Sequence, residues 1–133
     1  MVVVSRGRPG PLALCLDALS RLRYAPYEIV VVADPAGLQA VAAAGLDGLV
    51  KTVAFDVPNI SAARNAGIAA AAGEVVAFID DDAVPEPCWL HHLAGGLALG
   101  GRRQAAMCGA ATASRSSGGR AASTTLVCRC PCH

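Results

Sequence analysis

The sequence of 133 residues contains no long apolar run, few aromatic residues and no acidic residue after Glu86. No stretch of about 18 uncharged apolar residues occurs, so we predict no membrane-spanning helix. The first residues form a β-branched run instead of the basic region and apolar segment of a secretory signal, and we expect a cytoplasmic protein. Aromatic residues make up only 4% of the chain, which predicts a small core.

The cysteines do not follow the pattern of a disulfide-bonded scaffold. Two of the six, Cys15 and Cys88, stand alone in the body of the chain, and the other four crowd its C-terminal part. A disulfide framework in a small secreted domain would distribute its cysteines through the fold. We therefore expect the thiols of the body to be reduced.

Charge divides the chain into two parts. Residues 1–100 hold six Lys or Arg and ten Asp or Glu, a net charge of −4, whereas residues 101–133 hold five Arg and no acid, a net charge of +5. A shift of this kind often marks a boundary. We predict a domain over residues 1–100 and an irregular or disordered basic, cysteine-containing tail over residues 101–133.

The tail allows three interpretations. No stripe of large apolar residues runs along it, which is typical of a disordered basic segment. Its end, "CRCPCH", resembles a small metal knuckle but lacks the usual gaps of about two to four residues between ligands. The third interpretation is out-of-frame translation of a GC-rich gene. We favour the third, because acids and helical or strand periodicity disappear together at this point of the chain.

Segments typical of strands and helices alternate along residues 1–100. Apolar, β-branched runs predict strands at residues 2–5, 27–37 (ending in a turn at Asp34 and Pro35), 49–55 and 74–80. Helical spacing and stop signals predict helices at residues 11–22, 38–45, 59–73 (with Asn59 or Ser61 as N-cap) and 87–97 (opening near Pro87). This order predicts an α/β fold, with an open, mostly parallel sheet and helices on both faces.

Polar clusters follow three of the predicted strands. Ser5 to Arg8 come after the first strand, Asp34 after the second, and Asp80 to Asp82 after the fourth. In open α/β sheets, ligands bind outside the carboxyl ends of the strands. Strand ends are often polar for no functional reason, but three clusters at one edge favour a binding site.

The carboxylate triplet is the most unusual of these clusters. Three adjacent carboxylates repel one another unless a cation neutralises them. Side chains alternate along extended backbone, so Asp80 and Asp82 should point one way and Asp81 the other. Such a pair suits a hard divalent cation, which prefers oxygen ligands and often shares its shell with phosphates. The alternative is a solvated acidic turn.

Two common phosphate-binding motifs are missing. "SRGRPG" lacks the Gly-x-x-x-x-Gly-Lys-Ser/Thr pattern, and no Gly-x-Gly-x-x-Gly follows the first strand. These absences argue against a P-loop and a Rossmann dinucleotide site. A nucleotidyltransferase also uses an α/β fold and a metal, but its Gly-rich first loop fits "SRGRPG" poorly.

Three segments together resemble the inverting family 2 glycosyltransferases: "VVVSRGRPGPLALCLDAL", "YEIVVVADPAG" and "ISAARNAGIAAAAGEVVAFIDDDAVPEPCWL". The resemblance covers about residues 1–95, and its specific part is the block "ARNAG…GEVVAFIDDDAVP". It implies a truncated, Rossmann-like GT-A fold with the N-terminal, nucleotide-sugar-binding part only. It also implies Mn²⁺ or Mg²⁺, a UDP-, TDP- or GDP-sugar donor, an unknown acceptor and no nucleic-acid partner.

The resemblance assigns roles by position. Asp80 and Asp82 match the Asp-x-Asp pair and are the implied metal ligands, with Asp80 also near the donor ribose or sugar. Asp34 matches a carboxylate that contacts the nucleobase, although Ala33 departs from the usual motif there. The residues implied in nucleotide-sugar binding are Ser5, Arg8, Asp34, Arg64, Asp80 and Asp81.

Sugar transfer with inversion needs a general base that deprotonates the acceptor. In this family the base is an acid well beyond the Asp-x-Asp motif, and residues 87–133 contain none. We therefore identify no catalytic residue and expect the acceptor-binding region to be absent. The predicted function is a glycosyltransferase-like protein that binds a nucleotide-sugar through an Asp-x-Asp metal site, transferring the sugar if completed. The alternatives are a catalytically inactive remnant and a non-catalytic nucleotide-binding module.

Overall fold

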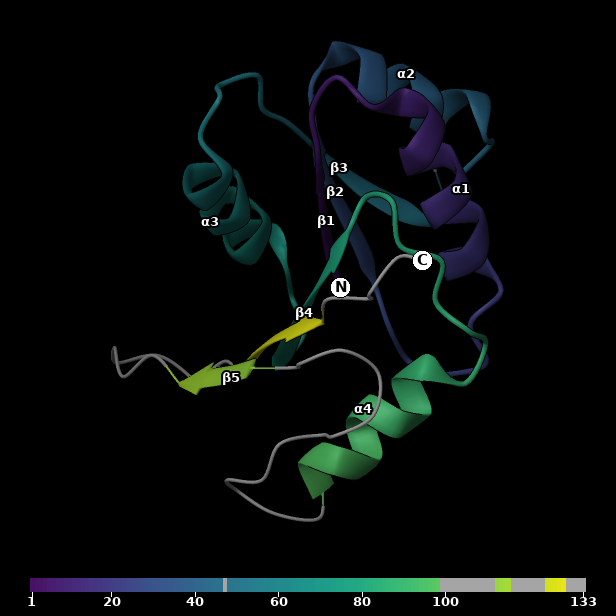
Figure 1. Cartoon of the computed structure of the whole chain (residues 1–133), viewed down its shortest axis with the longest axis vertical. Helices are drawn as coiled ribbons and strands as arrows, with labels where there is room; N and C mark the ends of the chain where they lie inside the picture. Colours follow the sequence, from purple (N-terminus) through teal and green to yellow (C-terminus); the bar gives the residue numbers. More distant parts are fainter. Residues whose placement is uncertain (47, 99–111, 116–123, 129–133) are drawn as a thin grey trace.

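The computed structural model describes residues 1–46, 48–98, 112–115 and 124–128. Its centre is a six-stranded sheet in the order β3-β2-β1-β4-β6-β5 (Figure 1). The strands are β1 (Val2–Ser5), β2 (Ile29–Ala33), β3 (Val50–Ala54), β4 (Val75–Asp80), β5 (Thr112–Arg115) and β6 (Thr124–Cys128). All neighbouring pairs are parallel except β5 and β6, which are antiparallel.

Four helices connect or follow the parallel strands. They are α1 (Pro9–Ser20), α2 (Pro35–Ala43), α3 (Ile60–Ala70) and α4 (Trp89–Ala98). Pro9 and Pro35 stand at the first turns of α1 and α2, where a missing N–H group costs no hydrogen bond. Before α1, Gly7 has a φ of +68°, which lets the chain turn directly from β1 into the helix.

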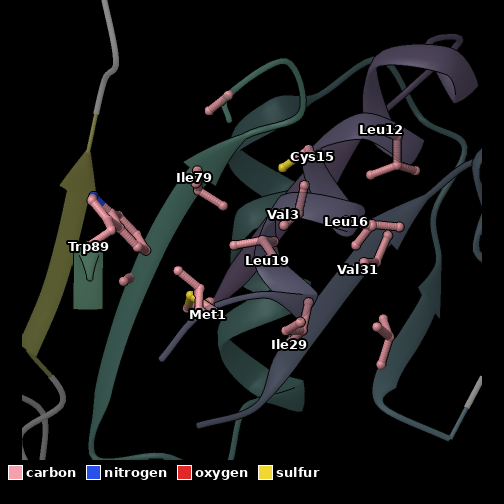
Figure 2. Close-up of a cluster of buried hydrophobic side chains, with 14 of the residues drawn as sticks. Met1, Val3, Leu12, Cys15, Leu16, Leu19, Ile29, Val31, Ile79 and Trp89 are labelled. Atoms are coloured by element: carbon pink, nitrogen blue, oxygen red, sulfur yellow. The ribbon is translucent and has the colours of Figure 1, made fainter. Parts of the chain in front are cut away.

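The helices cover both faces of the sheet (Figure 1). On one face, Val3 and Val31 pack with Leu12 and Leu16 of α1 and with Trp89 at the start of α4 (Figure 2). The opposite face carries a second, smaller cluster, in which the intervening strand residues meet α3; its members are Val2, Val30, Val32, Ala63, Val76 and Phe78. β1, β2 and β4 thus divide their apolar side chains between two cores, as the two-residue period of extended backbone requires. These three strands are buried on both faces, and their sequences are continuous apolar runs.

The predicted α/β class, with a mostly parallel sheet covered on both faces, is confirmed. Element bounds differ by a few residues: α2 begins at Pro35 and α4 at Trp89, not near residues 38 and 87. Strands β5 and β6 lie in the segment for which the sequence predicts no regular element. The metal knuckle suggested by "CRCPCH" lies outside the described residues except for Cys128, and the domain boundary at residue 100 stays a prediction.

None of the helices in the described part of the chain is both long enough and apolar enough to span a membrane.

Candidate functional site

A cleft of about 500 Å³ opens at the carboxyl ends of β1 and β4, beside the start of α3. Its polar side carries Ser5 from the end of β1, Arg6 and Arg8 from the loop after it, and the three aspartates at and just after the end of β4. Its other side is mainly apolar and comes from the segment between β3 and α3, with Phe55, Val57, Pro58, Asn59 and Ile60. The cleft therefore lies at the sheet edge where the sequence predicts a binding site.

The three aspartates differ in exposure, and only Asp80 belongs to β4, because the chain turns after it with a hydrogen bond from the N–H of Ala83 to the carbonyl of Asp80. Asp81 points inward, and its side chain is only 8% exposed. Asp80 and Asp82 line the cleft with side chains that are 49% and 42% exposed. All three aspartates therefore line the cleft, Asp80 and Asp82 with half-exposed carboxylates and Asp81 with a buried one.

Buried Asp81 has a partner for each carboxylate oxygen. Ser5 donates its hydroxyl hydrogen to Oδ2 over 2.7 Å, and Arg8 Nη1 donates to Oδ1 over 2.9 Å. A carboxylate out of water is costly unless it is paired and hydrogen-bonded, and these two contacts meet that requirement. Because β1 and β4 are neighbours, Ser5 at the end of β1 and Arg8 in the loop after it both reach the end of β4.

Arg8 joins two of the three aspartates. Its Nη1 atom bonds Asp81, and its Nη2 atom donates to Oδ2 of Asp82 over 3.0 Å. The hydrogen bond to Asp82, followed by the charge of Asp81, raises the pKa of Arg8. A planar guanidinium suits this bridging, because it presents several N–H groups in a fixed fork.

Arg64 reaches the cleft from α3. Its Nη2 atom lies 4.0 Å from Oδ1 of Asp80, a distance for an ion pair but not for a hydrogen bond. The guanidinium also lies over the ring of Phe78, 5.5 Å from the ring centroid, within the range of a cation–π interaction. The structure therefore brings Arg64 to the acidic motif.

Asp34 is placed differently. Its carboxylate caps α2 by accepting from the backbone N–H of Gly37 at 3.0 Å, and it accepts from that of Gly7 at 2.8 Å. These two contacts lower the pKa of Asp34, with the Gly37 contact the stronger cause. Asp34 is not among the cleft-lining residues. It supports the loop that carries Ser5 and Arg8, and its predicted contact with a nucleobase stays a prediction.

The cleft offers few protein ligands for a metal. Within the described ranges, no group of three or more His, Cys, Asp or Glu side chains is arranged to hold an ion. Asp80 and Asp82 still fit a Mg²⁺ or Mn²⁺ site of the kind that uses one or two carboxylates and takes its other ligands from water and substrate phosphates. In the free protein, however, the nearest positive charges to these carboxylates are Arg64 and Arg8.

The apolar side of the cleft is the part that the sequence analysis missed. It follows β3. Of the first four strands, β3 is the one after which the sequence analysis identified no polar cluster. The rule that ligands bind beyond the carboxyl ends of strands applies equally to this segment, "FDVPNI", and was the available signal. Asp56 in the same segment accepts a hydrogen bond from Arg6 Nε at 3.0 Å, which ties it to the loop after β1.

Comparison with known proteins gives a family and a fold. The family model described as glycosyl transferase family 2 matches residues 1–120. Among solved structures, TarS residues 1–349 from S. aureus match with a TM-score of 0.64 and 22% identity. This match covers 74% of the present chain and 31% of that one, so the present chain spans about a third of the TarS fragment. No curated protein matches the chain in sequence.

The likeness to TarS shows the fold alone, which is that of the GT-A-like glycosyltransferases. The family model extends over both sides of the cleft and over all four of the first parallel strands. On that match, the chain belongs to glycosyl transferase family 2.

Proposed function

We propose that this chain binds the nucleoside diphosphate of a nucleotide-sugar donor in the cleft beside Asp80 and Asp82. The observation that carries the proposal is the arrangement of two half-exposed carboxylates and an arginine around one cleft in a family 2 chain. A nucleoside has an apolar base and a polar ribose and diphosphate. The cleft has an apolar side and a polar side to match.

Different residues of the chain would bind different parts of the donor. Phe55, Val57 and Ile60 offer apolar surface to the base. Asp80 and Asp82 would hold Mg²⁺ or Mn²⁺, which neutralises charge on the diphosphate as it departs. Arg8 and Arg64 supply further positive charge beside the same carboxylates. Family membership supports a donor of this class, and UDP-, TDP- and GDP-sugars are all candidates.

The proposal for these 133 residues is donor binding. Transfer to an acceptor also needs a general base, and no Asp or Glu occurs among residues 87–133. Sugar transfer to an acceptor of unknown class is thus a wider proposal than donor binding.

Isothermal titration with UDP, TDP and GDP in the presence of Mn²⁺ tests donor binding. We expect heat with at least one of them, and loss of that heat with EDTA. Asp82→Asn should abolish the Mn²⁺-dependent part, whereas Asp17→Asn should not, because Asp17 is an exposed residue of α1 paired with Arg21. Folded wild-type protein that gives no heat with any of the three nucleotides would disprove the proposal.

A metal-independent nucleotide-binding module is the second candidate. It is favoured by Arg8, whose guanidinium already pairs with both Asp81 and Asp82 without an ion. The same titration separates the two functions. Binding that survives both EDTA and Asp82→Asn would assign the chain to the module.

A further inference from the structure

The loop after β1 places one guanidinium between two carboxylates of unlike surroundings. Asp81 is 8% exposed and also receives the Ser5 hydroxyl, whereas Asp82 is 42% exposed and has Arg8 as its ion-pair partner. The Arg8 side chain itself is 50% exposed. One of its two contacts is therefore fixed in the protein, and the other faces the cleft.

We propose that Arg8 is a positioning residue that occupies the place of a divalent cation at Asp82 in the free protein and turns to the donor diphosphate when the cation binds. The inference rests on the proposed function. Asp81 keeps Nη1 of Arg8 in place throughout. Nη2 leaves Oδ2 of Asp82 and becomes free to donate to a phosphate oxygen.

Charge and geometry support this exchange. Neighbouring carboxylates repel one another unless a positive charge screens them, and Arg8 supplies that charge at Asp82 in the absence of an ion. The contact between Arg8 and Asp81 is the harder of the two to break. A buried carboxylate that loses its partner is costly, whereas exposed Asp82 is hydrated again when Arg8 leaves it. A divalent cation competes only for the exposed contact.

The exchange predicts opposite effects of one substitution on two ligands. In Arg8→Gln, Mn²⁺ alone should bind more tightly than to wild type, by several-fold, because its competitor at Asp82 is gone. UDP in saturating Mn²⁺ should bind about tenfold more weakly, because a charge-assisted hydrogen bond to the diphosphate is lost. The free Mn²⁺ signal in electron paramagnetic resonance measures the first affinity, and calorimetry measures the second.

Arg64→Gln is the matched control for charge. It removes the same charge from the same acidic motif, but Arg64 lies 4.0 Å from Asp80 and makes no hydrogen bond to it. We expect a smaller gain in Mn²⁺ affinity than in Arg8→Gln. An equal gain would show that charge alone controls the ion, and it would overturn the proposal.

A second variant guards against loss of folding. Arg8→Gln leaves Asp81 buried with Ser5 alone, so the double variant Arg8→Gln/Asp81→Asn removes both charges together. It should show the same tighter Mn²⁺ binding and weaker UDP binding, with its fold checked by circular dichroism. Either folded variant that binds Mn²⁺ no more tightly than wild type overturns the role of Arg8. Wild-type protein that binds no nucleotide overturns the proposed function instead, so the two failures are distinct.

Discussion

Gly67 of α3 lies so close to Val2 of β1 that a Cβ atom on Gly67 would overlap the Val2 side chain. The same atom would stand 3.1 Å from Cγ2 of Val32 in β2. Both valines are almost fully buried in the smaller core cluster. The absence of a side chain at Gly67 therefore sets how closely α3 approaches the sheet, and with it the distance between the apolar side of the cleft and the aspartates.

Gly67→Ala should destabilise the protein by about 1–3 kcal/mol, because an added methyl group in a packed core forces backbone or side-chain shifts. Urea denaturation followed by circular dichroism measures the change. Gly10→Ala is the control: Gly10 lies in α1 with no atom near its missing Cβ, so alanine there should be neutral or stabilising. Equal loss in both variants would contradict the close approach of α3.

The start of α3 gives a second prediction. The sequence leaves Asn59 and Ser61 as alternative caps, and in the structure Asn59 Oδ1 accepts from the N–H of Ala62 at 3.0 Å. Asn59→Ala should cost about 1 kcal/mol of the free energy of unfolding. Ser61→Ala, inside the helix, should change it little. A larger loss of stability from Ser61→Ala than from Asn59→Ala, measured in the same denaturation series, would show that Asn59 is not the cap.

The architecture was predictable because three of its strands, β1, β2 and β4, are buried on both faces. Continuous β-branched runs such as "VVVS" and "IVVVA" are typical of buried parallel strands, and glycine and proline separate them from the helices. The strands β5 and β6 were not, because "TASR" of β5 lacks a large apolar residue and β6 joins the sheet by pairing with β4, which is distant in the chain. Strand pairing of that kind is set by tertiary context more than by local preference.

The site was predictable in part, for a related reason. The burial of Asp81 agrees with the prediction that it differs from Asp80 and Asp82, but the chain leaves extended backbone after Asp80, and Arg8 contacts Asp81 and Asp82 together. The partner of buried Asp81 could not be predicted from the neighbouring sequence, because Arg8 is 73 residues away along the chain. Asp34 shows the same limit. The sequence around a carboxylate at a strand end is the same whether the side chain faces a ligand or, as here, caps α2 and accepts from the N–H of Gly7.

Asp34 should make stability depend on pH. The N–H groups of Gly37 and Gly7 lower its pKa from the ordinary 3.8, so the folded state binds the proton less readily than the unfolded state. Its stabilising contribution is therefore complete above about pH 4 and is lost as the pH falls through the lowered pKa. The stability difference between wild type and Asp34→Asn should shrink from pH 7 to pH 3. A carboxyl resonance of Asp34 that titrates above 3.8 by nuclear magnetic resonance would refute this account.

Cys15 and Cys88 should differ sharply in reactivity. Cys15 is fully buried among the α1 leucines, and burial, followed by the charges of Asp81 and its neighbours, raises the pKa of its thiol to about 12. Since the thiolate is the reactive form, Cys15 should resist alkylation in the native protein, whereas exposed Cys88 should react. Peptide mapping after iodoacetamide treatment at pH 8 measures both sites. In urea the two should react alike, and native Cys15 that is modified as fast as Cys88 would mean that α1 does not seal this side of the core.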